Sequence, residues 1–471
     1  MKLTSEKLKN AVLIPSIFLI LMVLTVATNT INRNSFSVLS SFFLNGIVWL
    51  FLLIREINRR AFSISLVHWF FCLFFFFFAG LTQYVRDIFP RKGLFSDQLI
   101  LRTNLVLLAW TFLYSIGVYL AGIMKKRKTC NLRGTGFSER AEESASYYGN
   151  RTVVLLTLSI LILFWKIYSQ GIANLFISAR ATSTYEISSN SSINVLVDKI
   201  TMAISYFAVI FSFDYWRKKK GCPLFFFASC LCLFVSFFPL VVSRNTVAGL
   251  YLGILLYIAF FILKKGRVFF VLYLFSFVIM FPLLNSFRYG NLTSVSLGES
   301  FSTLLQNFNN EWLSSDYDAY SMLLTTMRYI GENGITFGRQ LLGVIFFWVP
   351  RTVWAGKPIA SGEFLGSFYQ WDFVNVSEPL VAEILINFGL IGIVVLSPFV
   401  GYFVERIDSA FWSKLGNKCK KNRVHVLYTF IVAYVLFVFR GALLSSFAYL
   451  CAVVFVWFVF TSRPLHIRIK Q

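Results

Sequence analysis

Hydrophobic runs long enough to cross a bilayer alternate with short polar segments along this chain. A membrane-spanning helix needs about 20 mostly apolar residues. Twelve such runs occur, at residues 11–30, 36–54, 61–82, 103–123, 152–169, 194–213, 223–242, 246–263, 268–286, 385–404, 424–439 and 442–460. The pattern therefore predicts an all-α polytopic integral membrane protein with about twelve transmembrane helices.

The third run differs from the others in being apolar on every side. It contains five consecutive phenylalanines, from Phe74 to Phe78. A helix that is apolar all round suits a position in contact with lipid. We therefore expect the helix over residues 61–82 to face the bilayer.

Composition excludes two broad classes of protein. Hydrophobic residues make up 57% of the chain and charged residues 14%, whereas an ordinary soluble domain has roughly 25% charged residues. Too few polar residues are present to cover the surface of a soluble enzyme. The apolar content is also far too high for a disordered chain.

The net charge of +23 comes from 44 Lys and Arg against 21 Asp and Glu. A basic balance often indicates a nucleic-acid partner, but 29 of these 44 residues fall in seven short segments that alternate with the rest. The segments are residues 2–9, 55–60, 125–151, 217–220, 264–267, 406–423 and 463–470. The positive-inside rule places them in the cytoplasm together with both termini. The charge is therefore an orientation signal, and no nucleic acid is expected as a partner.

One loop is much larger than the others. Residues 287–384 separate a nine-helix membrane region (1–286) from a three-helix membrane region with a cytoplasmic tail (385–471). A hydrophobic bundle needs no such loop, so we expect catalysis to concentrate in this external segment.

Parts of the loop have helical character. Residues 316–333 predict a helix that ends before Gly334, and residues 338–349 predict a short interfacial or re-entrant helix. Aromatic residues follow at Phe364, Phe368, Tyr369, Trp371 and Phe373. Because sugars stack their C–H faces on aromatic rings, this composition suits a carbohydrate ligand with an anionic head group.

External cations stand against the positive-inside bias and need another explanation. Among the external cations are Arg180 in the segment 170–193, Arg244 and Arg440 in very short turns, Arg288 at the close of the ninth span, and Arg351 and Lys357 in the large loop. Arginine binds phosphate oxygens in a bidentate manner. If these side chains converge at the outer headgroup level, they form a pyrophosphate-binding site. The alternative is that each reaches singly to a lipid phosphate.

Acidic residues of the loop are the candidates for a catalytic base, because none of the three histidines is predicted to be external. Glu383 lies at the outer mouth of the tenth span, and Glu378 begins the helix that leads into it. Asp316 and Asp318 have the D-x-D spacing of metal-dependent glycosyltransferases, but two acids in a first helical turn more often interact with the helix dipole. No external His or Cys cluster occurs, so neither a metal nor a cofactor is expected.

The region around Arg351 resembles a known family. Trp348-Val349-Pro350 precedes the stretch from Arg351 to Gly362 (RTVWAGKPIASG), and Ser377-Glu378 and the stretch from Ala382 to Gly389 follow. With the twelve-span plan and one large external loop, these motifs resemble the bacterial O-antigen polymerase (Wzy) and oligosaccharide repeat-unit polymerase families. Arg351 and Gly362 have the R-x10-G spacing of those families. A second such motif is missing, because the residue eleven positions after Arg180 is Ser191.

The resemblance implies a GT-C-like membrane glycosyltransferase of the bacterial cytoplasmic (inner) membrane, with its active site facing outward. Such an enzyme joins undecaprenyl-pyrophosphate-linked oligosaccharide repeat units into O-antigen or a related surface polysaccharide. The lipid-linked glycan is both donor and acceptor, and lipid pyrophosphate is the leaving group. The bilayer and a chain-length regulator protein are the further partners that the resemblance implies.

Roles for individual residues follow from the same resemblance. The expected catalytic residues are Arg351, Glu378 and Glu383. The residues expected to bind the pyrophosphate and the substrate are Arg180, Arg244, Arg288, Lys357 and Arg440. Two alternatives stay open. An O-antigen ligase uses the same donor with a different acceptor, and a polysaccharide flippase has a similar number of spans but should show two similar halves.

Overall fold

The computed structural model describes residues 5–27, 31–91, 93, 95–131, 145–176, 192–217, 222–259, 265–280, 310–415 and 424–461. Regular structure in these residues is helical throughout, without a strand. Seven helices among them are long and apolar enough to cross a membrane: Phe36–Ile57, Ile64–Arg86, Asp97–Met124, Asn150–Gln170, Leu196–Arg217, Leu380–Ser413 and Leu443–Thr461. The predicted all-α fold is confirmed, and its long apolar helices are those of a multi-pass membrane protein.

Five shorter apolar helices coincide with the other predicted runs. They are Lys9–Val23, Pro223–Ser236, Arg244–Ala259, Gly266–Phe275 and His425–Arg440. Each is shorter than the roughly 20 residues that a straight crossing of the bilayer requires. The total of twelve spans, the side on which each terminus lies and the GT-C-like architecture therefore stay predictions.

The membrane-region helices lie in the chain on both sides of the large loop. They are α1 (Ser5–Ala27), α2 (Phe36–Ile57), α3 (Ile64–Phe71), the π-helical η1 (Cys72–Phe78), α4 (Ala79–Arg86), α5 (Asp97–Asn131), α6 (Ala145–Gln170), the short η2 (Ala173–Leu175), α7 (Ser192–Arg217), α8 (Pro223–Ser236), α9 (Arg244–Val247), η3 (Ala248–Leu252), α10 (Gly253–Ala259), α11 (Gly266–Phe275), η4 (Ser276–Met280), α17 (Leu380–Leu415), α18 (Val424–Arg440) and α19 (Leu443–Thr461).

The large loop contains four further helical segments in its described part. They are η5 (Ser315–Tyr317), α14 (Ala319–Asn333), α15 (Arg339–Ile345) and α16 (Ser361–Phe368). The helix predicted over residues 316–333 is present as η5 and α14. The one predicted over 338–349 is present as the shorter α15, whose interfacial or re-entrant position stays a prediction. Gly334 follows the last residue of α14 with a φ of 81°, as a helix-terminating glycine does.

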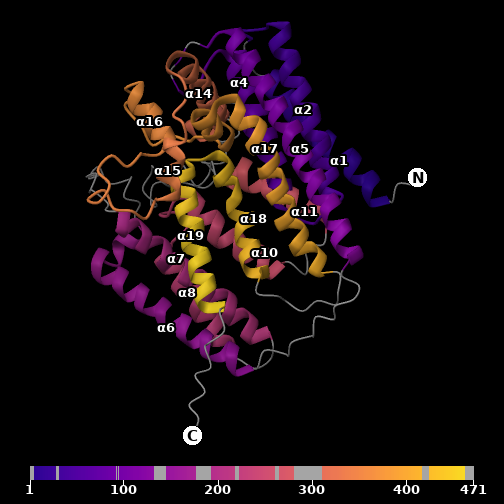
Figure 1. Cartoon of the computed structure of the whole chain (residues 1–471). Coiled ribbons are helices and arrows are strands. Elements are labelled where there is room, and N and C mark those ends of the chain that lie inside the picture. The colour runs from indigo at the N-terminus through magenta and orange to yellow at the C-terminus, as the bar shows by residue number, and fades with distance from the viewer. Residues whose placement is uncertain are drawn as a thin grey trace.

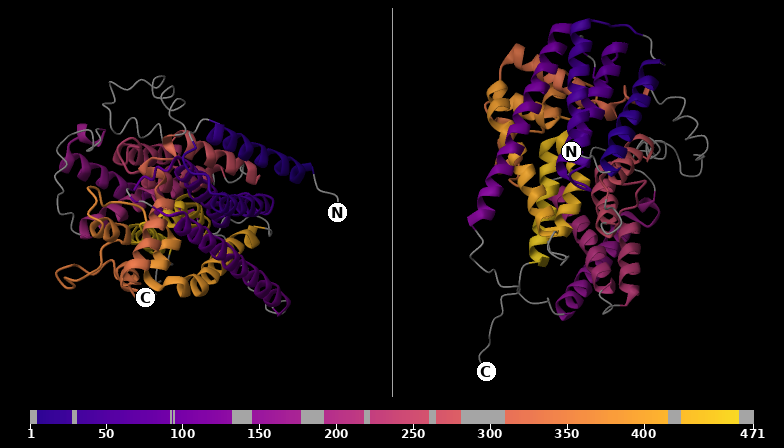
Figure 2. Two further views of the ribbon diagram at one scale, coloured as in Figure 1. Left: turned by 90° about the horizontal axis from the view of Figure 1, so that it is seen from above. Right: turned by 90° about the vertical axis from the view of Figure 1, so that its right-hand side faces the viewer.

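Two large hydrophobic cores hold the membrane-region helices together, and a smaller third one joins α14, α16 and α17. In Figure 1, α1 to α5 lie on one side of the molecule and α6 to α8 on the other, and Figure 2 shows the same separation from above. Helix α18 joins the two cores, because Val432 and Leu436 belong to the first and Phe430 and Tyr434 to the second.

The third hydrophobic run is the most deeply buried helix of the described part. Every residue from Ile64 to Tyr84 is buried, against α2, α14 and α18 among others. The expectation that this run faces lipid was therefore wrong. Its Phe-rich stretch packs against other rings instead, as Phe74 does on Phe70 with ring centroids 4.2 Å apart. A helix that is apolar on all sides can equally be surrounded by protein.

Helices α5 and α17 pack along each other because glycines let their backbones approach closely. A Cβ atom on Gly117 would overlap the carbonyl oxygen of Pro398, and one on Gly401 would overlap that of Tyr114. Small residues at helix–helix contacts are typical of membrane proteins. This crossing fixes α17, whose two ends carry the polar features described next.

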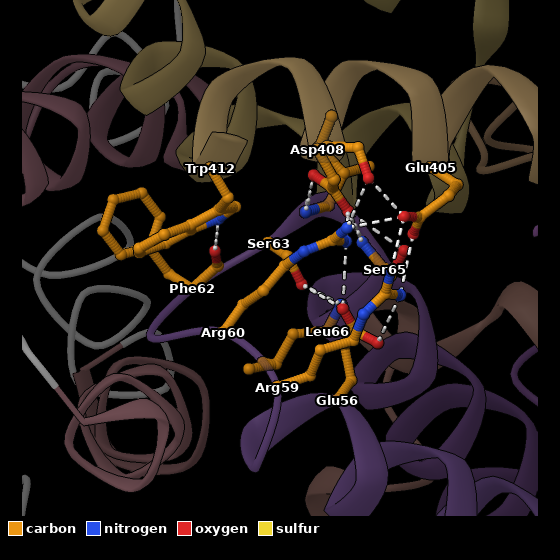
Figure 3. A network of polar contacts seen from close by, with 12 residues as sticks. Glu56, Arg59, Arg60, Phe62, Ser63, Ser65, Leu66, Glu405, Asp408 and Trp412 are labelled. Atoms are coloured by element: carbon orange, nitrogen blue, oxygen red, sulfur yellow. Dashed lines mark hydrogen bonds and ion pairs between the residues drawn. The ribbon is translucent and has the colours of Figure 1, made fainter. Parts of the chain in front are cut away.

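Buried ion pairs join one end of α17 to the segment after α2 (Figure 3). Arg60 donates from Nη2 to Glu405 Oε1 (2.7 Å) and from Nη1 to Asp408 Oδ2 (3.2 Å). Asp408 also accepts from the backbone N–H groups of Ile64 (3.0 Å) and Ser65 (3.1 Å), which lie at the start of α3. Two segments predicted to be cytoplasmic therefore meet at this end of the bundle.

Candidate functional site

At the opposite end of α17, the residues that precede the helix border an open cavity of about 440 Å³. This volume lies within the range of roughly 300–1,000 Å³ that small-molecule sites occupy. Five separate parts of the chain line it, among them the residues Arg91, Arg244, Asp316, Asp318, Ser377 and Arg440. All six come from segments that the sequence predicts to be external.

Arg244 and Asp316 form a bidentate ion pair on the wall of this cavity. Arg244 is the first residue of α9 and donates from Nη1 and Nη2 to the two carboxylate oxygens of Asp316 in η5. About a fifth of each side chain is exposed. A ligand in the cavity can therefore reach both groups.

Arg440 reaches the same segment from the end of α18. It donates from Nε to the Asp316 carbonyl oxygen (3.1 Å) and from Nη2 to the Ser315 carbonyl oxygen (3.1 Å). Its Nη2 also donates to Asp318 Oδ1 (3.0 Å). The guanidinium of Arg440 thus holds both the backbone of residues 315 and 316 and the carboxylate of Asp318.

Asp318 is the buried centre of these contacts. It accepts from Arg91 Nη2 at 3.0 Å and from Ser377 Oγ at 2.6 Å, in addition to Arg440. Its side chain is almost fully buried. A buried carboxylate is stable only when it is paired and hydrogen-bonded, and here two arginines and a hydroxyl do both.

The chemistry of the lining favours an anionic ligand. Three arginines and two aspartates among the lining residues give a formal charge of +1. Phosphate oxygens bind a guanidinium in the same bidentate manner as a carboxylate. A phosphate-containing ligand can therefore compete with the Asp316 carboxylate for Arg244.

Arginines pair with both acids of the D-x-D motif. Asp316 lies in the first turn of η5 and Asp318 is the N-cap residue of α14, and each forms an ion pair with an arginine. No group of three or more His, Cys, Asp or Glu side chains within the described residues is arranged to hold a metal ion.

Glu378 and Glu383 lie outside the lining of the cavity. Glu378 is fully buried and accepts from Thr326 Oγ1 at 2.6 Å, whereas its Oε2 has no hydrogen-bond donor among the described residues. Burial, and then the neighbouring Glu383 carboxylate, raise the pKa of Glu378 well above its usual range. Glu383 accepts from Ser361 Oγ (2.6 Å) and from the backbone N–H of Leu443 (3.2 Å) at the start of α19.

Arg351 and Lys357 form a separate structure that does not line the cavity. Arg351 donates to the Lys357 carbonyl oxygen (3.0 Å), and Lys357 Nζ donates to the carbonyl oxygens of Phe347 (2.6 Å) and Val349 (3.0 Å). Burial and the adjacent Arg351 lower the pKa of Lys357. Both cations therefore stabilise their own turn, and their roles in catalysis and binding stay predictions.

The glycine of the R-x10-G spacing has a packing role. A Cβ on Gly362 would lie 2.7 Å from the Val376 carbonyl oxygen, which is too close for an alanine to fit without movement. Gly362 thus lets α16 pack closely against the backbone of Val376 and Ser377.

Two of the six predicted cations converge, namely Arg244 and Arg440. Arg180 and Arg288 lie outside the described residues. Arg91 and Ser377 were not singled out from the sequence. Arg91 could have been found, since it is an external arginine by the same topological argument, whereas nothing in the pattern distinguishes Ser377 from other serines.

Comparison with known proteins adds no family assignment. No protein-family model, curated protein or solved structure matches this chain.

Proposed function

We propose that the protein is a membrane glycosyltransferase that polymerises lipid-pyrophosphate-linked repeat units at the outer face of the bacterial cytoplasmic membrane. The observation that carries the proposal is the cavity in which Arg91, Arg244 and Arg440 meet beside two carboxylates. A pyrophosphate on a membrane lipid needs this combination of cations at one end of a helical bundle.

The reaction needs no nucleotide, because the lipid pyrophosphate itself is the leaving group. An acceptor hydroxyl oxygen bonds to the anomeric carbon of the donor, and the bond from that carbon to the phosphate oxygen breaks. The bonding electrons leave with the lipid pyrophosphate, whose growing charge Arg244 and Arg440 stabilise. The hydroxyl proton passes to a carboxylate.

Asp316 is the carboxylate best placed for that proton. It lines the cavity and is partly exposed, whereas Glu378 and Glu383 lie outside the lining. Pyrophosphate would compete with the Asp316 carboxylate for Arg244 at the moment when a base is required. Glu383 is the second candidate, because it holds the start of α19 beside the cavity.

The ligase and the flippase remain the alternatives. A ligase would use the same cavity for the same donor, so only the acceptor distinguishes it. A flippase draws no support from the two hydrophobic cores, since they are built from different numbers of helices and are not two similar halves.

The deciding experiment is deletion of the gene followed by electrophoresis of the surface glycan. Loss of the long ladder with retention of a single repeat unit on its anchor supports the polymerase. Loss of every attached repeat unit indicates a ligase. An unchanged ladder in the deletion strain would refute both.

Purified protein separates these enzymes from a transporter. Wild-type protein in lipid nanodiscs should lengthen a lipid-pyrophosphate-linked repeat unit, and the double variant Arg244→Gln/Arg440→Gln should not. Arg102→Gln, at an exposed position on α5, serves as the matched control.

A further inference from the structure

Beside the cavity, four aromatic side chains form a surface that we name the aromatic shelf: Phe368, Tyr369, Trp371 and Phe373. Phe368 is 46% exposed and Phe373 is 55% exposed. Exposed rings in such a group need an explanation, because single exposed apolar residues are common but clusters mark binding surfaces.

The backbone fixes the orientation of the shelf. Helix α16 ends when Gln370 adopts a left-handed conformation with a φ of 54°, and Trp371 then donates its N–H to the Gly366 carbonyl oxygen at 2.9 Å. A residue other than glycine in this conformation is uncommon and mildly strained. The turn brings the rings of Tyr369 and Trp371 to within 22° of parallel, with centroids 6.2 Å apart.

Charged hydrogen-bonding groups border the rings. The guanidinium of Arg91 lies 5.8 Å from the Trp371 centroid and 5.9 Å from that of Phe373. On the far side Arg328 lies 5.5 Å from the Tyr369 centroid and donates to Glu332 at 2.8 Å. The shelf is thus a set of flat apolar faces with donors and acceptors at its margins.

The shelf continues directly into the cavity. Phe373 is one of the residues that line it, and Arg91 is shared, since it lies over Phe373 and also pairs with Asp318. A molecule whose anionic head lies among the arginines would therefore extend its next part over these rings.

We propose that the aromatic shelf binds the glycan of the lipid-linked substrate, a proposal that rests on the proposed function of the cavity. Sugar rings present C–H groups on one face and hydroxyls at their edge. The shelf offers rings for the first and the charged margin of Arg91, Arg328 and Glu332 for the second. An acyl chain has no hydroxyls to bond with these charged groups, which disfavours a lipid tail as the occupant.

Trp371 is the residue to test, because it lies between Tyr369 and Arg91 and does not itself line the cavity. Trp371→Leu removes the flat face but keeps an apolar side chain, and Trp371→Phe keeps a flat face. Trp348→Leu changes a tryptophan that is 61% exposed and lies outside the shelf, so it is the control.

Binding is measured in nanodiscs with two probes: the lipid-free glycan released from the host strain's own surface polysaccharide, and inorganic pyrophosphate. Trp371→Leu should weaken glycan binding about tenfold, equivalent to roughly 1.4 kcal/mol, and leave pyrophosphate binding unchanged. Trp371→Phe and Trp348→Leu should bind both probes nearly as the wild type does.

The two proposals fail in different ways. Glycan affinity that is equal in wild type and Trp371→Leu, or absent from the wild type, overturns the shelf, and a role for these rings in the membrane interface then explains them better. Loss of pyrophosphate binding in Arg244→Gln but not in Trp371→Leu would still support the cavity. Absence of pyrophosphate binding in the wild type refutes the proposed function itself.

Discussion

Gly441 lies against the backbone of Glu378, so closely that a Cβ atom on the glycine would overlap the Glu378 carbonyl group. Gly441 follows Arg440 and has a φ of 85°, a left-handed conformation that alanine adopts at a cost of roughly 1–2 kcal/mol. The contact therefore fixes the turn that carries Arg440 against the segment that leads into α17.

Gly441→Ala should displace Arg440 and lower both stability and polymer length. Both the left-handed backbone and the overlap with Glu378 disfavour an alanine at position 441. The measurements are the apparent melting temperature in detergent and the surface-glycan ladder. Gly331→Ala is the control, because Gly331 is exposed on α14 and a Cβ there meets nothing within 4 Å. Equal behaviour of the two variants would mean that the Gly441 contact has no role in positioning.

Arg440→Lys should lose most activity although the charge is kept. A lysine cannot donate at once to the Ser315 carbonyl, the Asp316 carbonyl and the Asp318 carboxylate, because those contacts use the planar fork of the guanidinium. The readout is the rate at which purified protein extends a lipid-linked repeat unit.

Comparison with Arg351 tests the cavity against the family resemblance. Arg351→Lys changes a residue that contacts only the turn around Lys357 among the bonds described above. We expect a smaller loss of activity there than at Arg440. A larger loss at Arg351 would move the active site to the turn that the R-x10-G spacing marks.

Asp316→Asn should abolish transfer and keep pyrophosphate binding, because it removes the proposed base but no cation. Glu383→Gln should leave the rate closer to wild type, since Glu383 lies outside the cavity lining and its bonds hold Ser361 and Leu443. Single-turnover rates with a lipid-linked donor distinguish the two. If Glu383→Gln is the slower variant, Glu383 is the base, as the sequence alone suggested.

The raised pKa of Glu378 predicts that the stability of the protein depends on pH. Its pKa is raised well above the ordinary value of 4.5 by burial and by Glu383, so the folded protein keeps a proton that the unfolded chain releases. The free energy of unfolding therefore falls as pH rises from about 4.5 towards the raised pKa, by at most about 1.4 kcal/mol per pH unit. Below pH 4.5 both states hold the proton and the effect disappears.

Glu378→Gln mimics the protonated side chain and should reduce this dependence. The measurement is the apparent melting temperature between pH 5.5 and 8.5, with Asp372→Asn at an exposed position as control. The idea fails if wild type and Glu378→Gln lose stability in parallel over that range.

The sequence predicted that long apolar runs form helices, because apolar length is the main signal for them, but the number of helices that span the membrane stays a prediction. It failed for the run at residues 61–82, since lipid and protein are both apolar and an all-round hydrophobic helix carries no sign of which one surrounds it. The convergence of Arg244 and Arg440 could be expected because both oppose the topological charge bias. Their partners could not, since Arg244 and Asp316 are 72 residues apart and only the packing of α9 beside the large loop joins them.

The ion pairs at the other end of α17 allow a prediction about stability alone. Arg60 is buried with Glu405 and Asp408, whereas the neighbouring Arg59 bonds to Glu405 with 37% of its side chain exposed. Arg60→Ala removes the arginine that pairs with buried Asp408 and one of the two that pair with Glu405, and should cost about 3–5 kcal/mol. Arg59→Ala should cost about 1 kcal/mol or less, because water can replace an exposed arginine.

The quantities to compare in the Arg60→Ala and Arg59→Ala variants are the melting temperature, the amount of protein in the membrane and the glycan ladder. Since this network lies far from the cavity along α17, Arg60→Ala should reduce the amount of polymer and leave its chain-length distribution unchanged. A shifted distribution at wild-type protein levels would show instead that the two ends of α17 are coupled in catalysis.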